Sequence, residues 1–306
     1  MEKKILKGDD FMAGNNGSGA LSSGNFGEVY VEGVTKIYEK EDECQTVLQD
    51  CTFHVQRGKL TVLMGPSGCG KTVLINLIAG YEKPTSGHIY IDDISVVGPG
   101  RDRLVVFQET ALFPWMTAYC NVVFGCQVRK VTKCEIKERA ELVLKKVGLY
   151  EFRDKYPSQL SGGMQRRAEL ARAIINDPKI LILDEPFRGL DAMTRQLMQE
   201  FYVGLFEEVG RTNLFVTHEI DEAIFLADRL IIMTFQPGRI KAEIEVDLPR
   251  PREFRMLASP RFMEIREQAI ELLYEEAAKA FAAGNKTAYD LVGAVVARKG
   301  ICKKQA

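Results

Sequence analysis

The amino-acid sequence predicts an α/β fold built around an open parallel β-sheet. Four short apolar runs are typical of buried strands, and stretches with helical periodicity separate them along the chain: 60–64, 104–107, 180–183 and 213–216. The run 180–183 has no polar member, as expected of a central parallel strand that is covered on both faces. Because such sheets bind ligands beyond the carboxyl ends of their strands, we expect the functional residues to follow these four runs.

A glycine-rich loop follows the first run and precedes an apolar stretch, 73–79, that can form a helix. Strand, glycine-rich loop, Lys-Thr and helix together make a P-loop, in which backbone N–H groups and the helix N-terminus cradle phosphates. Lys71 would reach the β- and γ-phosphates, and the Thr72 hydroxyl would ligate Mg²⁺. The sequence therefore predicts a site for ATP or another nucleoside triphosphate with Mg²⁺, formed by Gly65, Pro66, Ser67, Gly68, Cys69, Gly70, Lys71 and Thr72.

Four polar residues stand at the ends of the other three runs: Gln108, Asp184, Glu185 and His218. Asp184 suits a Mg²⁺ ligand, either direct or through the ion's hydration shell. Glu185 can face a water aligned with the γ-phosphate and act as a general base. Gln108 can hold that water or the metal, and His218 can donate to the γ-phosphate. Alone, an acidic pair after a strand can be a solvated turn, and a lone histidine can be structural. The prediction of a catalytic site therefore rests on these residues occurring at strand ends together with a P-loop.

The sequence divides into three parts. Residues 1–27, rich in Gly, Ser and Asn, predict a flexible tail. Residues 28–252 predict one domain, in which antiparallel strands near 29–34 and 46–55 are joined by a charged turn that carries Tyr38, and a helical insert covers about 109–160. Residues 253–306 predict a helical extension with helices near 261–282 and 288–298. We expect their apolar faces to pack on the main domain or on a partner chain rather than to insert into a membrane.

Composition excludes several classes of protein. The formal net charge of −1 gives no electrostatic reason to expect a nucleic-acid partner. Seven scattered cysteines without a Cys-x-x-Cys pair indicate reduced thiols in a cytosolic setting, and no histidine has zinc-like spacing to a cysteine. No secretory leader is recognisable, and the most apolar window, 224–235, is too short to span a bilayer. Work at a membrane would therefore require contact with another protein.

A segment near the start, 24–30, resembles the glycine-rich loop of protein kinases. A kinase also needs an His-Arg-Asp catalytic loop and an Asp-Phe-Gly metal site. Neither tripeptide occurs in the sequence, which excludes a kinase.

The segment Leu-Ser-Gly-Gly-Met-Gln at 160–165 resembles the signature motif of ATP-binding cassette (ABC) ATPases, and it precedes the 180–184 strand at the separation this family uses. Gln108 matches the family's Q-loop, the segment 189–191 its D-loop, His218 its switch histidine and Tyr38 its adenine-stacking aromatic. The resemblance covers residues from about 28 to 252.

This resemblance implies that two such domains sandwich two ATP molecules head to tail. Each P-loop would then face Ser161, Gly162 and Gly163 of the other chain, with Asp191 close to the same nucleotide. A helix N-terminus with glycines makes a second anion site, which agrees with that arrangement. The implied partners are a second ATPase subunit, transmembrane permease subunits and, indirectly, an extracytoplasmic solute-binding protein, with this chain peripheral on the cytoplasmic face of the inner membrane.

Within the family, the chain is most similar to ATPase subunits of importers for nitrate, sulfonates, taurine and bicarbonate. The similarity rests on the segments 112–117, 186–195, 237–240 and 247–252. Departures from the family pattern are Val73, where a second hydroxyl is common, and Arg188 and Gly189, where small apolar residues are usual. The implied function is an ATPase that powers import of a small anion or organic sulfonate. The alternative is a non-transport ABC protein of translation or DNA repair, but the second cassette or long heptad coil of those proteins is not found.

One aromatic segment, Phe113 to Tyr119, follows Gln108. It is a candidate for touching the permease, and its alternative role is a core patch of the helical insert around the single tryptophan.

Overall fold

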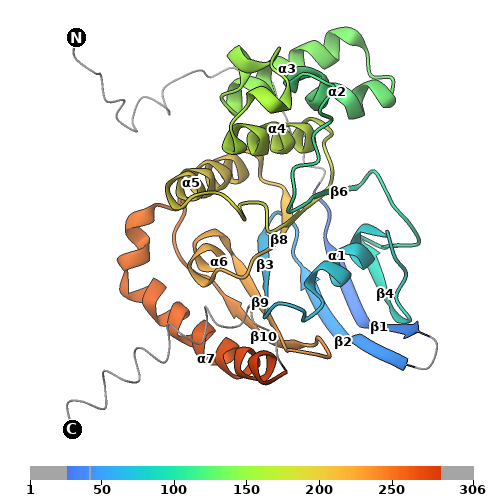
Figure 1. Ribbon diagram of the computed structural model, residues 1–306, viewed down its shortest axis with the longest axis vertical. Coiled ribbons are helices and arrows are strands. Elements are labelled where there is room, and N and C mark those ends of the chain that lie inside the picture. Colours follow the sequence, from blue (N-terminus) through green and yellow to red (C-terminus); the bar gives the residue numbers. More distant parts are fainter. Residues whose placement is uncertain (1–25, 41–42, 284–306) are drawn as a thin grey trace.

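A six-stranded β-sheet runs through the centre of the molecule (Figure 1). The computed structural model describes residues 26–40 and 43–283. All neighbouring strands of this sheet are parallel except the last two, β9 and β10, which form an antiparallel hairpin. The four predicted parallel strands are therefore confirmed, and they lie side by side. In spatial order the strands are β10 (Ile240–Glu245), β9 (Arg229–Met233), β3 (Leu60–Met64), β8 (Thr212–Val216), β7 (Ile180–Asp184) and β6 (Arg103–Val106).

Both faces of this sheet are covered, and alternate residues of one strand enter different cores. On β7, Leu181 and Leu183 belong to the core shared with the helices that follow it in the chain, whereas Ile180 and Ile182 belong to the core shared with the N-terminal β-structure. Every residue of β3, β7 and β8 is buried. This two-sided burial explains why the sequence of the central strands is apolar throughout.

A second, antiparallel sheet lies beside the first, with β1 (Val29–Lys40) between β2 (Glu43–Val55) and β4 (Ser86–Ile91), followed by the short β5 (Ile94–Ser95). The predicted antiparallel pair is confirmed, but β1 continues well beyond residue 34. Bulges shift its register after Val31, and Gly33 adopts a φ of 58° there. An extra residue reverses which side chains face inward, so the alternation that marks a strand breaks off in the sequence. Helix α1 (Lys71–Ala79) contacts β2, β6 and β7 and ends at Gly80, whose φ is 80°.

The predicted helical insert forms α2 (Ala118–Val128) and α3 (Lys133–Lys146), followed by single turns at 150–152 and 157–159. These helices pack on α4 (Gly162–Ile175) around a core of their own, at the top of Figure 1. Thr117 and Thr132 cap the first two helices by accepting from the backbone N–H groups of Cys120 and Glu135. Such caps set where each helix begins.

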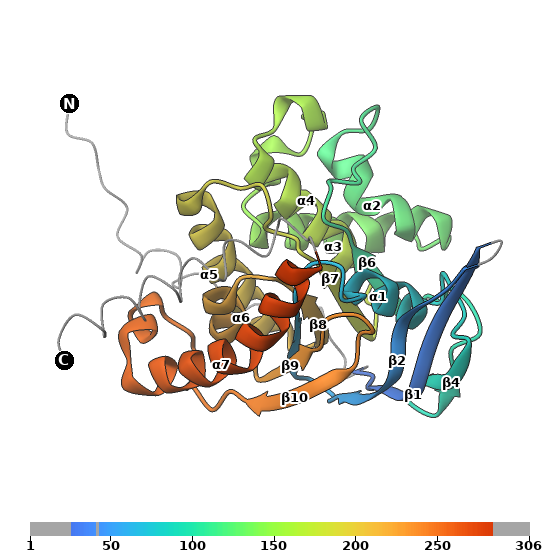
Figure 2. The ribbon, with the colours of Figure 1, turned by 60° about the horizontal axis from the view of Figure 1, so that its bottom comes forward.

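Three further helices complete the fold: α5 (Ala192–Val209), α6 (Ile220–Leu226) and α7 (Pro260–Ala282), with a short turn of 3₁₀-helix at Phe254–Ala258 before α7. Helix α7 lies along the edge of the molecule against α6, β9 and β10 (Figure 2). Its apolar face, Phe262, Ile265, Ala269 and Leu273, is buried in the same core as β3. The larger of these side chains, Phe262, Ile265 and Leu273, each contribute about 1.5–3 kcal/mol on burial.

This packing confirms the expectation that the C-terminal helix covers the main domain. The predicted boundary after residue 252 stays a prediction. The second predicted helix at 288–298 and residues 1–25 of the predicted tail lie outside the described residues. Among the helices of the described ranges, none is both long enough and apolar enough to cross a bilayer.

Candidate functional site

The glycine-rich loop joins β3 to α1 at the carboxyl end of the central sheet. Gly68 and Gly70 have φ values of 83° and 97°, a backbone conformation that strongly favours glycine. A Cβ on Gly70 would also lie 2.7 Å from the Leu48 side chain. No side chain caps α1, the arrangement in which a helix N-terminus can receive an anion.

Lys71 is held over this loop. Its Nζ donates to the carbonyl oxygens of Gly65, at 2.7 Å, and Pro66, at 3.1 Å, and only 7% of the residue is exposed. A buried ammonium group is costly unless it has such partners, so the loop carbonyls fix the charge in place. The lysine is thereby positioned at the mouth of a loop that can bind phosphate.

Thr72 and Asp184 meet beside the loop. The Thr72 hydroxyl donates to Asp184 Oδ2 at 3.3 Å, and Asp184 is the last residue of β7. Burial, followed by the charge of Glu185, raises the pKa of Asp184 above its ordinary value. A hydroxyl and a carboxylate side by side are the oxygen ligands that a hard divalent cation prefers.

Glu185 turns away from β7 into a second group of side chains. Its φ is 44°, and its backbone N–H donates to Val216 O at the end of β8. Glu185 Oε1 lies 3.3 Å from His218 Nδ1, and Oε2 lies 3.0 Å from a guanidinium nitrogen of Arg188. Burial works to raise the pKa of Glu185, but the hydrogen bond and charge of His218, with Lys71 and Arg188, outweigh it and hold that pKa below its ordinary value.

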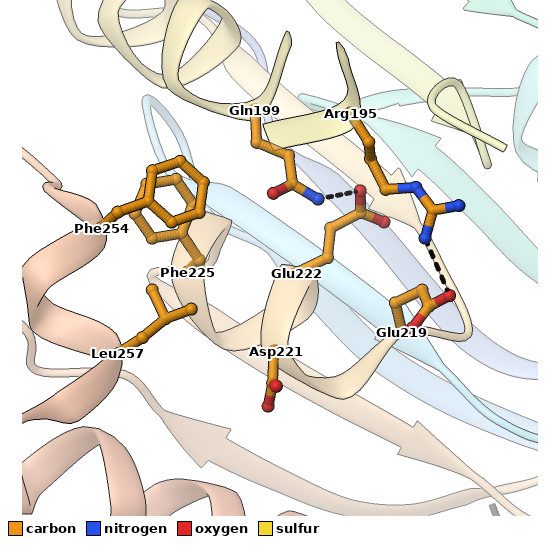
Figure 3. A pocket seen from close by; sticks show the side chains of 8 residues that line it. All are labelled: Arg195, Gln199, Glu219, Asp221, Glu222, Phe225, Phe254 and Leu257. Atoms are coloured by element: carbon orange, nitrogen blue, oxygen red, sulfur yellow. Dashed lines mark hydrogen bonds and ion pairs between the residues drawn. The ribbon is translucent and has the colours of Figure 1, made fainter. Parts of the chain in front are cut away.

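His218 follows β8, as predicted, and begins the segment that leads into α6. Its hydrogen bond to Glu185 is the main cause that raises its pKa above 6.5. The next residue, Glu219, pairs with Arg195 of α5 at 3.1 Å, and Gln199 of α5 donates to the buried Glu222 at 2.7 Å (Figure 3). These contacts fasten the histidine segment to α5.

Gln108 stands two residues beyond β6 and is exposed. Within residues 26–40 and 43–283, its side-chain amide has no hydrogen-bond partner, so the structure does not join it to the Asp184 and Glu185 groups. Its main chain, however, is firmly held, because Arg166 donates to Gln108 O at 2.6 Å and to Phe107 O at 2.8 Å.

Two residues of this site were not predicted from the sequence. Arg166 pairs with Glu169 at 2.6 Å on the buried side of α4, and Glu169 also accepts from Ala111 N at 2.5 Å. The pair thus fixes the backbone from Phe107 to Ala111. A signal was available, since opposite charges stand three residues apart in this helix.

Tyr38 lies within β1 rather than on the predicted turn, because the bulged strand extends to Lys40. Its hydroxyl donates to Glu82 Oε2 at 2.5 Å, and Lys36 Nζ lies 4.8 Å from the ring centroid. Burial and the hydrogen bond to Glu82 raise the pKa of Tyr38 to about 12.

Ser161, Gly162 and Gly163 form the N-terminus of α4, where the Ser161 hydroxyl accepts from Met164 N. This terminus lies beside the start of α5: a Cβ on Gly163 would be 3.1 Å from Thr194. Asp191 caps α5 by accepting from Thr194 N at 3.0 Å. Helix α4 packs on α2, α3, α5 and β6, whereas α1 packs on β2, β6 and β7. The N-termini of α1 and α4 thus follow different segments of the chain, although both helices contact β6.

A family model described as ABC transporter matches residues 48–188. An uncharacterised ABC transporter ATP-binding protein of Methanocaldococcus jannaschii is 43% identical over 81% of this chain and 92% of its own length. The taurine import ATP-binding protein of Pseudomonas aeruginosa is 42% identical over 72% of this chain and 83% of its length. The nitrate import ATP-binding protein of Synechococcus elongatus is 39% identical over 82% of this chain and 93% of its own length. The aliphatic sulfonates import ATP-binding protein of Bacillus cereus is 39% identical over 79% of this chain and 94% of its own length. The bicarbonate transport ATP-binding protein of Synechococcus elongatus is 42% identical over 80% of this chain and 89% of its own length.

Solved structures of ATP-binding cassettes have folds similar to that of this chain. A dimeric post-hydrolysis state of an ATP-binding cassette with ADP and phosphate has a TM-score of 0.63 and 33% identity, and covers 72% of this chain and 100% of its own. A Clostridium perfringens protein described as part of an ABC transporter complex has a TM-score of 0.65 and 28% identity. The match covers 78% of this chain and 98% of that protein. The chain belongs to the ATP-binding proteins of ABC transporters, resembles their anion and sulfonate importer subgroup, and is an ATPase that hydrolyses ATP to ADP and phosphate.

Proposed function

We propose that this chain powers an importer for a small anion or an organic sulfonate, by hydrolysing ATP at the carboxyl edge of its central sheet. The observation that carries the ATPase part is the meeting of Thr72 with Asp184 and of Glu185 with His218 next to the glycine-rich loop. The solute class is inferred from relatives named for taurine and nitrate import.

The loop from Gly65 to Thr72 would hold the phosphates of ATP. Its backbone N–H groups and the uncapped start of α1 provide the anion site, and Lys71 adds a positive charge beside it. Thr72 and Asp184 fit Mg²⁺, because their oxygens already lie 3.3 Å apart and are hard donors. When bound, the ion would neutralise charge on the phosphates.

Glu185 is proposed as the general base for the attacking water. Its pKa is held low, so it is ionised and ready to accept a proton at neutral pH. His218 orients that carboxylate through Nδ1. Its Nε2, which lies 3.8 Å from Glu219 Oε1, would donate to the γ-phosphate when nucleotide is bound. Gln108, whose backbone is fixed by Arg166, would bring its side-chain amide to the water or the metal when nucleotide is present.

The second half of each site would come from another copy of this chain or from a paralogue. Ser161, Gly162 and Gly163 would bind the γ-phosphate held by the partner's P-loop, with Asp191 close by, and Tyr38 would stack on adenine. Support comes from the dimeric form of the similar cassette structure.

The permease would rest on the aromatic segment Phe113 to Tyr119 and on the exposed aromatic rings near it. Trp115 is 70% exposed, which excludes a core role for this ring, and Phe107 and Tyr81 are 40% and 50% exposed with their rings 6.2 Å apart. Exposed aromatic groups of this kind commonly mark protein contacts. The chain would then lie on the cytoplasmic face of the inner membrane as a peripheral subunit, and a solute-binding protein would act on the other side.

Copurification from membranes tests this proposal. We expect a permease with several hydrophobic spans and a solute-binding protein, and ATPase activity of that assembly should rise with nitrate, taurine or another small anion. Copurification with ribosomes or DNA instead would contradict the proposal and support a non-transport ABC protein.

A further inference from the structure

The turn between β9 and β10, residues 234–239, touches the glycine-rich loop from outside. The side-chain amide of Gln236 donates to Gly68 O at 3.1 Å. Two residues on, Gly238 lies so close to the loop that a Cβ there would overlap the carbonyl oxygen of Cys69. The conformation of the loop therefore depends on the position of this turn.

The same turn is hydrogen-bonded to β2 beneath the loop. Gly238 N donates to Val47 O at 2.8 Å, and Gly238 O accepts from Gln49 N at 2.9 Å. Between these two residues, the Leu48 side chain lies against Gly70. The turn and β2 thus enclose one side of the loop.

The C-terminal helix α7 fixes the turn through one buried carboxylate. Glu276 is 1% exposed, and its Oε2 accepts from the backbone N–H of Phe235 at 2.8 Å. Its Oε1 accepts from Lys241 at 3.0 Å and from Lys279 at 2.8 Å. A buried carboxylate with its charge balanced is costly to disturb, so this contact holds the turn rigidly against α7.

We propose that Glu276 and Gln236 are positioning residues for nucleotide binding, and that α7 supports the P-loop through the 234–239 turn. The proposal rests on the proposed function of Gly65–Thr72 as the phosphate site. It assigns a role to the C-terminal extension: α7 keeps the loop in its phosphate-binding shape without touching the nucleotide. Loosening the turn lowers affinity for ATP, whereas the chemical step, carried by Glu185 and His218, is affected much less.

The chain offers a matched control for Glu276. Glu275 also pairs with Lys241, at 2.8 Å, but its side chain is 68% exposed. Within the part of the chain that the structure describes, no hydrogen bond or ion pair joins it to the turn. Glu276→Ala should weaken binding of a non-hydrolysable ATP analogue about tenfold, because the Phe235 N–H loses a charged partner. Glu275→Ala should leave the affinity within about twofold of the unchanged chain.

Gln236→Ala supplies a second variant that does not disturb the core, since Gln236 is exposed. It should raise the KM for ATP several-fold with kcat nearly unchanged, and its melting temperature should stay that of the unchanged chain. A merely structural role for the turn would instead lower the melting temperature without this split between KM and kcat.

Analogue affinity of the full-length chain, measured by calorimetry for all variants and for Lys71→Ala, decides the question. If Gln236→Ala and Glu276→Ala both bind the analogue like Glu275→Ala, the support role of α7 is wrong. If Lys71→Ala binds as well as the unchanged chain, the phosphate site itself has been misassigned, which is a failure of the proposed function.

Discussion

Glu185 is held by contacts from three directions. Its backbone N–H is bound to the end of β8, and its two carboxylate oxygens lie near His218 and Arg188. The position between β7 and β8 follows from the parallel pairing of these strands, which brings Asp184 opposite Val216. The residue thus combines a fixed orientation with a carboxylate that is ionised at neutral pH and can accept a proton.

Replacing Glu185 with glutamine tests this role. The Glu185→Gln side chain keeps the size and most contacts of the original but cannot accept a proton. We expect ATP binding to persist, turnover to fall by a factor on the order of 10²–10⁴, and a dimer to accumulate in the presence of ATP. Phosphate release and size-exclusion chromatography measure both effects. Hydrolysis at the native rate would show that another group is the base.

The pairing of His218 with Glu185 predicts how the histidine titrates. The hydrogen bond between them raises the pKa of His218 and lowers that of Glu185. The charged pair is therefore complete between these two pKa values, and it is lost as the pH rises through the raised pKa of His218. NMR titration should show one of the three histidines with a midpoint above 6.5, returning toward 6.5 in Glu185→Gln. Assignment through His218→Gln identifies the signal, and an unchanged midpoint would mean that the contact is absent in solution.

Among single residues, those at strand ends could be predicted from the sequence and those defined by distant partners could not. Asp184, Glu185 and His218 stand at or just beyond the ends of apolar strands, so parallel pairing alone brings them to one edge. Arg188 was noted only as a departure from the family pattern. Its ion pair with Glu185 depends on how the chain turns after β7, which local sequence does not specify.

At the scale of elements, α4 links the predicted second anion site to the Gln108 segment. Its first turn carries Ser161–Gly163, and one turn later Arg166 and Glu169 hold the backbone of residues 107–111. Sequence periodicity located this helix and the apolar face that packs on α2 and α3. The Arg166–Glu169 pair is buried on another face of the helix, so it could be identified only from the neighbouring segment.

This ion pair gives a prediction about stability. Glu169→Ala would leave Arg166 buried beside carbonyl groups with no carboxylate, and should lower the free energy of unfolding by about 3–5 kcal/mol. Urea unfolding followed by circular dichroism measures the change.

The matched control is Glu135→Ala. Glu135 pairs with Arg139 on the surface of α3, with side chains 45% and 39% exposed, so its loss should cost less than about 0.5 kcal/mol. If the two substitutions lower the free energy of unfolding equally, the Arg166–Glu169 pair does not stabilise the fold as a buried ion pair.

At the scale of the whole molecule, the fold class and the order of elements could be predicted, but the contacts between distant parts could not. Alternating apolar strands and helices were enough to predict the parallel sheet. Helix α7 packs along β9 and β10, and Glu276 accepts a hydrogen bond from the 234–239 turn. These contacts join residues far apart in the sequence, and no local pattern encodes them.

The central claim is that each ATP site is shared between two chains, one giving the P-loop and the other Ser161–Gly163. Mixing two inactive variants tests it directly: Lys71→Ala removes the phosphate-binding lysine, and Gly162→Asp places a negative charge at the N-terminus of α4. A mixed dimer contains one site with an intact P-loop and an intact facing α4. ATPase activity should therefore return when the two variants are mixed, although each alone is inactive. No activity in a mixture shown to contain mixed dimers would contradict the account.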